Sequence, residues 1–212
     1  LSGPWKQKLK EEKDLAKLKT AASKKPDLLM TLGDHYYNGT GGAIKDLEAA
    51  FNTFKKGYSV TGNGSFFVKM MLLNTLRPKR TRTDIICAWS SLCNVNPARS
   101  ELAAYTVSKV LEHLSSFAHG HHIAEMCDLS SDFVENVTNP NSKPYTGSSL
   151  DETIANACAK EIASFLKKNA KGHHGSDKED EDEEEEDDED EEEDDDSSEE
   201  DSEEDDSSEE DD

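Results

Sequence analysis

The sequence lacks long apolar runs, and this absence excludes a membrane-spanning helix. No stretch of 18 or more apolar residues occurs among its 212 residues, whereas a helix that crosses a bilayer requires about 20 in succession. The common catalytic signatures are missing as well: there is no HExxH, no GxSxG and no Gly-Lys-Ser/Thr phosphate loop. We therefore expect no enzymatic activity and no cofactor.

Apolar side chains are absent from residues 177–212. This segment holds 30 acidic residues and one lysine, Lys178, so its charge is −29, whereas residues 1–176 hold 17 acidic and 23 basic residues and carry +6. A segment that can bury nothing cannot offset the entropy of ordering its backbone, and its like charges keep it extended. The sequence predicts a disordered acidic tail that follows a mildly basic folded part.

The tail resembles the acidic tails of histone chaperones and high-mobility-group proteins. This resemblance implies that the tail binds histones or other basic proteins. Two alternatives stay open: weak binding of Ca²⁺ by the carboxylates, and a solubilising arm that lies over the basic body of the same chain. Five serines have an acidic residue at the second and third following positions, which is typical of phosphorylation by acidophilic kinases: Ser197, Ser198, Ser202, Ser207 and Ser208.

Apolar residues recur at helical spacing along the rest of the chain, and no strand pattern interrupts them. The spacing predicts helices at about 5–24, 26–37, 46–58, 66–76, 83–92, 97–119, 122–137 and 149–171. Asp46, Thr83, Asn96 and Ser149 are the expected N-terminal signals, with Glu152 completing a capping box behind Ser149. Short turns between such helices favour antiparallel helix pairs, so we expect an all-α fold.

Residues 31–58, TLGDHYYNGTGGAIKDLEAAFNTFKKGY, resemble one Sel-one-like repeat, a relative of the tetratricopeptide repeat. That family has Leu-Gly-x-x-Tyr in its first helix, a glycine-rich loop, an Asp, and Ala-x-x-x-Phe in its second helix. The matching residues are Leu32, Gly33, Tyr36, Gly39, Gly41, Asp46, Ala50 and Phe54. The match covers 28 of 212 residues, Lys56-Gly57 replaces the usual small pair, and no second copy is convincing.

The resemblance implies antiparallel helix pairs, arranged either as a tetratricopeptide-like or Sel-one-like superhelix or as an irregular bundle, that bind other proteins. In such a hairpin Gly33 allows close helix approach, and Asp46 caps the second helix. Ala50 and Phe54 would fill the gap, and the loop glycines would supply positive φ angles. We expect the partner surface to be shaped by four aromatic residues, which would equally well fill a core: Tyr36, Tyr37, Phe54 and Tyr58.

Two basic segments could contact phosphates. Residues 6–25 hold eight lysines, and residues 77–82 hold four basic residues. Trp5 is the only aromatic residue near them, which argues against stacking on nucleic-acid bases. The alternatives are a solvated helix face, a surface loop, and a docking place for the acidic tail of the same chain.

The remaining candidate sites depend on the compartment. Three sequons make Asn38, Asn63 and Asn136 candidate glycosylation sites, for which we expect loops. Four cysteines without a Cys-x-x-Cys pair allow either two disulfides or four reduced thiols: Cys87, Cys93, Cys127 and Cys158. Histidines cluster at 119–122 and 173–174, but their spacing matches no standard zinc site, so we expect no metal.

Together these patterns divide the chain into a basic amphipathic helix at 1–25, a helical domain at 26–171 and the acidic tail at 172–212. The sequence favours a non-enzymatic protein–protein interaction scaffold whose acidic arm binds basic, histone-like partners. The alternatives are a histone or basic-protein chaperone driven by the tail, and a secreted or lumenal acidic phosphoprotein that binds calcium weakly. The nucleus or cytoplasm is favoured, but a start at Leu1 leaves a removed secretory signal open.

Overall fold

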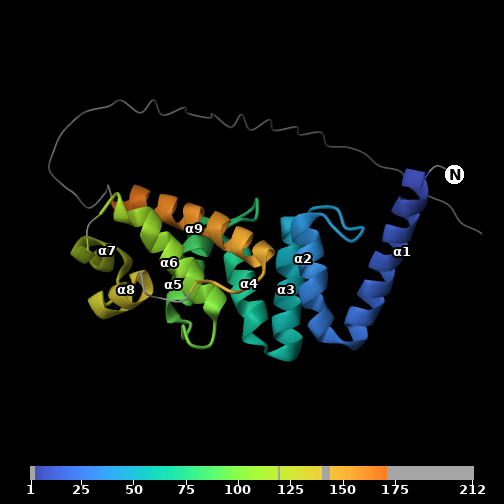
Figure 1. The fold of residues 1–212 in the computed structure, drawn as a ribbon, viewed down its shortest axis with the longest axis horizontal. Helices are drawn as coiled ribbons and strands as arrows, with labels where there is room; N and C mark the ends of the chain where they lie inside the picture. The colour runs from blue at the N-terminus through green and yellow to red at the C-terminus, as the bar shows by residue number, and fades with distance from the viewer. Residues whose placement is uncertain (1–2, 119, 140–143, 171–212) are drawn as a thin grey trace, which may run out of the picture. The chain divides into compact units, whose positions relative to one another are not determined.

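The computed structural model describes residues 3–118, 120–139 and 144–170, and in these ranges the predicted all-α fold is confirmed (Figure 1). The described part holds no strand. Its helices are α1 (Gly3–Lys24), the 3-10 helix η1 (Pro26–Leu28), α2 (Leu29–Asn38), α3 (Leu47–Thr61), α4 (Gly64–Asn74), α5 (Arg82–Asn94), α6 (Glu101–Ser115), α7 (Gly120–Cys127), α8 (Ser131–Thr138) and α9 (Ser149–Ala170). The acidic segment 177–212 lies outside the described residues.

Helices α2 and α3 form the hairpin expected at residues 31–58. A Cβ atom built on Gly33 would lie 2.6 Å from Cζ of Phe54, so the glycine is what allows the two helices to meet at this point. The side chain of Asp46 accepts a hydrogen bond from the backbone N–H of Ala49 at 3.0 Å and caps α3. In the connecting loop, Gly39, Gly41 and Gly42 have φ angles of 68°, 61° and 84°.

The helices after this hairpin pack mainly on their neighbours in the chain, and α9 returns across them. Gly57 of α3 lets α4 approach, since a Cβ there would lie 2.8 Å from Cζ of Phe66. Helix α9 packs along α6 and also contacts α4, α5 and α7. Its inner face is fully buried, with Ile154, Cys158 and Ile162 at 0% exposure. One continuous apolar core therefore connects the α2–α3 hairpin with the later helices.

Three helix N-caps differ from the predicted ones. Helix α5 is capped by Thr81, not Thr83, through a capping box in which the Asp84 side chain accepts from the Thr81 backbone. Helix α6 starts at Glu101 behind the N-cap Ser100, four residues later than Asn96 predicted. Helix α9 is preceded by Ser148, whose hydroxyl accepts from the Asp151 N–H at 3.2 Å, so Ser149 is not the cap. In each case another hydroxyl within a few residues satisfies the exposed N–H groups.

The single helix predicted at 122–137 is wrong. Asp128, at φ 54°, ends α7, and Ser130 caps a separate helix, α8, by accepting from the Phe133 N–H at 3.1 Å. The helix predicted at 97–119 is also shorter than expected, since α6 ends at Ser115 and Gly120 begins α7. A left-handed residue followed by a capping serine breaks a helix without proline or glycine.

Helix α1 is the least embedded of the long helices. Every described residue from position 3 to 14 is exposed, and Ala22 is its only buried residue. Gly42 of the loop touches its middle, since a Cβ there would lie 2.7 Å from the backbone carbon of Glu11. None of the helices in the described ranges has the length and apolar character needed to cross a bilayer.

Candidate functional site

The four aromatic residues predicted to shape a partner surface do not gather on one face. Phe54 is fully buried, at 0% exposure, in the core between α2 and α3. Tyr36 and Tyr37 lie half-buried near the C-terminal end of α2. Tyr58 lies toward the other end of α3, is 39% exposed and packs against Phe67, with 5.3 Å between the ring centroids. These positions give the four residues separate surroundings.

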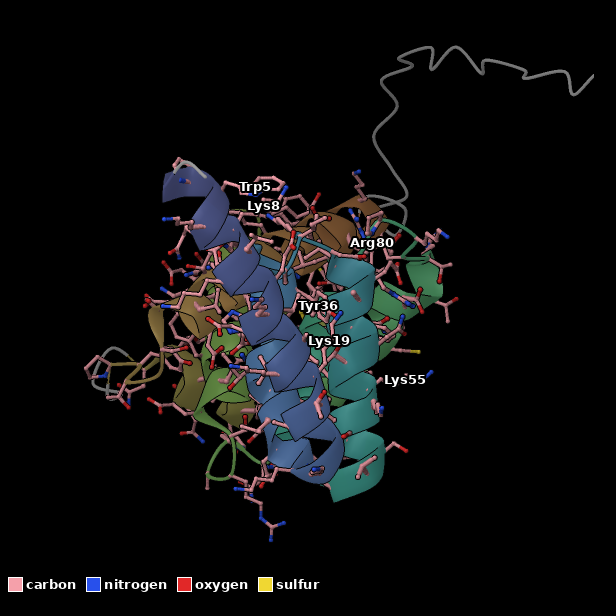
Figure 2. All side chains as sticks on the ribbon, turned by 90° about the vertical axis from the view of Figure 1, so that its right-hand side faces the viewer. Trp5, Lys8, Lys19, Tyr36, Lys55 and Arg80 are labelled. Carbon is pink, nitrogen blue, oxygen red and sulfur yellow. The ribbon has the colours of Figure 1, made fainter. Side chains whose placement is uncertain are left out.

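The two tyrosines of α2 each lie under a lysine side chain. The ammonium of Lys19, from α1, is 5.9 Å from the ring centroid of Tyr36, and Figure 2 shows the two side by side. The ammonium of Lys45 is 5.8 Å from the ring centroid of Tyr37. Burial raises the pKa of the Tyr37 hydroxyl, so this group stays protonated. The contacts at Tyr36 help to hold α1 against the hairpin.

The basic segment 77–82 is largely occupied by contacts within the fold. The guanidinium of Arg77 lies 4.1 Å from the ring centroid of Phe51 and pairs with Glu48 at 3.5 Å and with Asp84 at 3.4 Å. Arg80 pairs with Glu161 of α9 at 2.9 Å. These arginines connect α3, α5 and α9, which leaves the segment few cations for a phosphate-bearing partner.

An apolar groove of about 840 Å³ lies between α5, the turn that follows α6, α7 and the last two turns of α9. Two of its side chains are unusually exposed for apolar residues, Ile86 at 49% and Phe117 at 41%, while Trp89 forms a buried floor at 7%. The large apolar lining residues are Ile86, Trp89, Phe117, Met126, Phe165 and Leu166. An open apolar surface with a formed floor is typical of a binding groove.

Polar side chains border this groove. On one side the guanidinium of Arg82 lies 5.5 Å from the Phe165 ring centroid and donates to Oδ1 of Asn169 at 2.6 Å. On the other side stand His122 and Glu125, both mostly exposed. An apolar floor with a mixed polar rim is the usual composition of a protein-binding surface.

The covalent chain links this groove to the acidic tail. Ala170, the last residue of α9, belongs to the groove lining. The acidic run starts at Asp177, seven residues later in the sequence. Seven residues span at most about 25 Å, which is the greatest distance that the covalent chain allows between Ala170 and the start of the acidic run.

A buried lysine joins three helices elsewhere in the fold. The ammonium of Lys69, on α4, pairs with Asp34 of α2 at 2.7 Å and with Asp151 at the start of α9. The Lys69 side chain is 5% exposed, and its ammonium also lies 5.4 Å from the Phe54 ring centroid. Burial raises the pKa of Asp34, while the attraction of Lys69 opposes this shift. We call this arrangement the Lys69 clamp, because the Lys69 ammonium pairs with both Asp34 and Asp151 and so joins their helices.

The four cysteines are free thiols in the structure, and their surroundings predict unequal reactivity. Burial raises the pKa of Cys93 and Cys158 to about 12 and that of Cys127 to about 11, whereas Cys87 is exposed. Because the thiolate is the reactive form, we expect an alkylating reagent at about pH 8 to label Cys87 at least about tenfold faster than the others. Mass spectrometry of the native protein over time measures this order. Fast labelling of Cys158 would contradict the buried placement.

The candidate modification sites are distributed differently from expectation. Asn38 is the last residue of α2, and Asn63 is the N-cap of α4, where its side chain accepts from the Ser65 N–H at 3.0 Å. Asn136 lies within α8 and not in a loop. All three are exposed. The five candidate phosphorylation serines lie outside the described residues: Ser197, Ser198, Ser202, Ser207 and Ser208.

The histidine clusters fall only partly within the structure. His119, His173 and His174 are outside the described residues. In the ranges that are described, no three His, Cys, Asp or Glu side chains come together in a way that could hold a metal ion.

Sequence reasoning missed both the groove and the Lys69 clamp. The groove had a weak signal at most: Ile86 is an exposed apolar residue on α5, and Phe117 lies in the turn that follows α6. The clamp had none, because Asp34, Lys69 and Asp151 are far apart in the chain and each is an ordinary charged residue on its own helix.

The chain matches no protein-family model, no curated protein and no solved structure.

Proposed function

We propose that this protein is a non-enzymatic binding module for basic, amphipathic segments of other proteins. The apolar groove takes the apolar face of the partner helix, and the tail takes its lysines and arginines. The observation that carries the proposal is the position of the groove at the end of α9, from which the strongly acidic segment continues.

The groove supplies the apolar half of this recognition. An amphipathic helix presents apolar side chains at every third or fourth position, and such a helix commonly binds in an apolar groove between other helices. Ile86 and Phe117 are the exposed side chains that a partner would cover. Covering apolar area stabilises a complex by about 25 cal/mol per Å², so these residues are expected to contribute strongly to affinity.

The tail supplies the electrostatic half. Its charge of −29 favours a cationic partner and increases the rate of encounter at low ionic strength. The tail cannot fill the groove itself, because residues 177–212 have no apolar side chain. A partner that is both basic and amphipathic can therefore bind the groove and the tail, whereas a purely basic polymer can bind the tail alone.

The test uses two synthetic peptides with the same number of lysines and the full-length protein. One peptide of about 18 residues places leucines along one helical face, and the other replaces these leucines by serine and glycine. We expect the leucine peptide to bind more tightly than the serine and glycine peptide. The double variant Ile86→Ser/Phe117→Ser is expected to lower the affinity for the leucine peptide about tenfold or more. Isothermal titration calorimetry measures both affinities.

The matched control is Ile44→Ser/Val60→Ser, which removes two apolar side chains exposed at 86% and 57% away from the groove. This control is expected to leave the affinity for both peptides unchanged. Removing residues 177–212 should lower the affinity for both peptides and abolish most of its salt dependence. Equal affinity for the two peptides would exclude a role of the groove in binding. The remaining function would then be that of a chaperone driven by the tail alone. Unchanged binding after removal of the tail would exclude the electrostatic arm.

A further inference from the structure

Helix α1 carries a row of lysines on the face opposite its contacts with the hairpin. At 3.6 residues per turn, these lysines lie within about 60° of arc and extend over about 27 Å. We call them the lysine stripe: Lys6, Lys10, Lys13, Lys17 and Lys24. The buried Ala22 and the half-buried Leu15 and Leu18 lie on the other side of the helix. All five lysines are exposed.

The acidic residues of α1 do not neutralise the lysine stripe. Glu11 lies on the side that faces the loop at Gly42, and Glu12 lies well away from the stripe on the helix surface. Asp14 flanks one edge of the stripe. Within the described ranges, none of the five lysines takes part in an ion pair. The stripe is therefore a linear array of uncompensated positive charge.

Repulsion within the lysine stripe destabilises α1. Lys6 and Lys10, Lys10 and Lys13, and Lys13 and Lys17 are spaced at i+3 or i+4, and like charges at these spacings destabilise a helix. The first three turns of α1 bury no residue that could offset this repulsion. About three helical turns without packing are marginal in water, so an anionic segment along the stripe would stabilise this part of α1 by removing the repulsion.

We propose that the lysine stripe of α1 is the docking surface for the chain's own acidic segment, residues 177–212. The segment offers 30 carboxylates over 36 residues, a linear charge that matches a linear row of lysines. From Ala170 to the C-terminus the chain has 42 residues, which span up to about 140 Å when stretched. This proposal does not depend on the proposed function, because the contact forms in the free protein.

Tethering is the reason to choose this occupant over a nucleic acid or an anionic membrane. A segment joined covalently to its binding surface acts at an effective concentration of about a millimolar. A free polyanion must displace it, and must also approach a chain with a net charge of −23. A basic partner and the lysine stripe would bind the same carboxylates of the tail. Binding of the partner would therefore displace the tail from α1.

The test is carbodiimide crosslinking of the full-length protein at low salt, followed by peptide mapping. The reagent joins a lysine ammonium to a carboxylate only where the two are in contact. We expect peptides that contain the lysine stripe to hold at least about fivefold more crosslinks to residues 177–212 than other exposed lysines do, and this excess to disappear in 1 M NaCl.

Two variants with the same change in charge make the test specific. The stripe variant replaces Lys6, Lys10, Lys13, Lys17 and Lys24 by glutamine. The control variant replaces five exposed lysines on other elements by glutamine: Lys55, Lys56, Lys79, Lys160 and Lys168. The control is expected to keep the crosslinks between the tail and α1. Because docking stabilises α1, removing residues 177–212 is expected to make hydrogen exchange at residues 3–17 faster at low salt, and the same removal is expected to have no effect in the stripe variant. Unchanged or slower exchange after removal of the tail from the wild-type protein would overturn the proposal.

The other outcomes also overturn it. Crosslinks spread evenly over all exposed lysines would mean that the tail has no preferred site. Crosslinks found only between ¹⁵N-labelled and unlabelled copies would assign the stripe to the tail of a second copy. Loss of the crosslinks on addition of micromolar single-stranded DNA, or of vesicles containing phosphatidylserine, would show that one of these is the preferred occupant.

Discussion

Replacing Gly33 by valine is expected to lower the free energy of unfolding by about 3 kcal/mol, because this position has no room for a side chain. Even a Cβ atom would lie 2.6 Å from Cζ and 2.8 Å from Cδ1 of Phe54. Phe54 is fully buried and cannot swing into solvent, so α2 and α3 must separate. Urea unfolding followed by circular dichroism measures the loss, which corresponds to a decrease of about 10 °C in Tm.

Two further variants distinguish crowding from a general effect of losing a glycine. Gly64, at the start of α4, has no atom within 4 Å of a built Cβ. Gly64→Ala is therefore expected to stabilise the protein by up to about 1 kcal/mol. Combining Gly33→Ala with Phe54→Leu should cost less than the sum of the two single changes, since the smaller side chain makes room for the new methyl group. Strict additivity would contradict direct contact between the two positions.

The α2–α3 hairpin could be predicted from sequence because its determinants are local. The glycines of the loop, the cap at Asp46, and the pair Gly33 and Phe54 all lie within one short segment. Each of these residues acts through a contact or a backbone conformation within the segment itself. Kinship with Sel-one-like repeats stays a hypothesis, because the geometry of one hairpin follows from these contacts whether or not the families are related.

Helix boundaries were less predictable because several hydroxyl groups compete for each helix start. Thr81 and Thr83 are both suitable caps, and the choice follows from Asp84, which completes the capping box with Thr81. The break between α7 and α8 depends on Asp128 in the left-handed region, which nothing in the apolar periodicity indicates. Such choices depend on which arrangement lets the apolar faces of the helices reach the common core.

The candidate groove could not be predicted because it is formed by helices that are distant in the chain. Trp89 and Phe165 come from α5 and α9, and their meeting depends on α9 crossing back over the earlier helices. The tail, by contrast, was evident from composition alone. The proposed function therefore combines one feature that composition reveals with one that only tertiary packing creates.

Replacing Lys69 by methionine is expected to lower the free energy of unfolding by about 3 kcal/mol at neutral pH. Methionine keeps most of the side-chain volume but leaves the carboxylates of Asp34 and Asp151 without their cation, and breaking a buried ion pair from one side typically costs about 3–5 kcal/mol. The lower end applies because the two aspartate side chains keep 28% and 23% exposure. Urea unfolding at about pH 7 measures the change.

The pH dependence identifies the cause of that loss. Burial already raises the pKa of Asp34 above its usual value, so its protonation favours the folded state. The stability linked to Asp34 is therefore fully present below the pKa of the unfolded chain and is lost as pH rises through the higher folded pKa. Without Lys69, which supplies the largest opposing attraction, the pKa of Asp34 in the folded state rises further. The difference between wild type and Lys69→Met should thus shrink as pH falls from about 7 to about 4.

A surface ion pair provides the matched control for this clamp. Lys109 pairs with Glu112 at 2.9 Å, but Glu112 is 69% exposed, so Lys109→Met is expected to cost less than about 0.5 kcal/mol. In the Lys69→Met background, Asp34→Asn should recover part of the lost stability at neutral pH, because it removes one of the two uncompensated charges. If Lys69→Met unfolded as wild type does at both pH values, the lysine would not be holding α2, α4 and α9 together. A loss that Asp34→Asn could not relieve would instead point to packing around the side-chain stem.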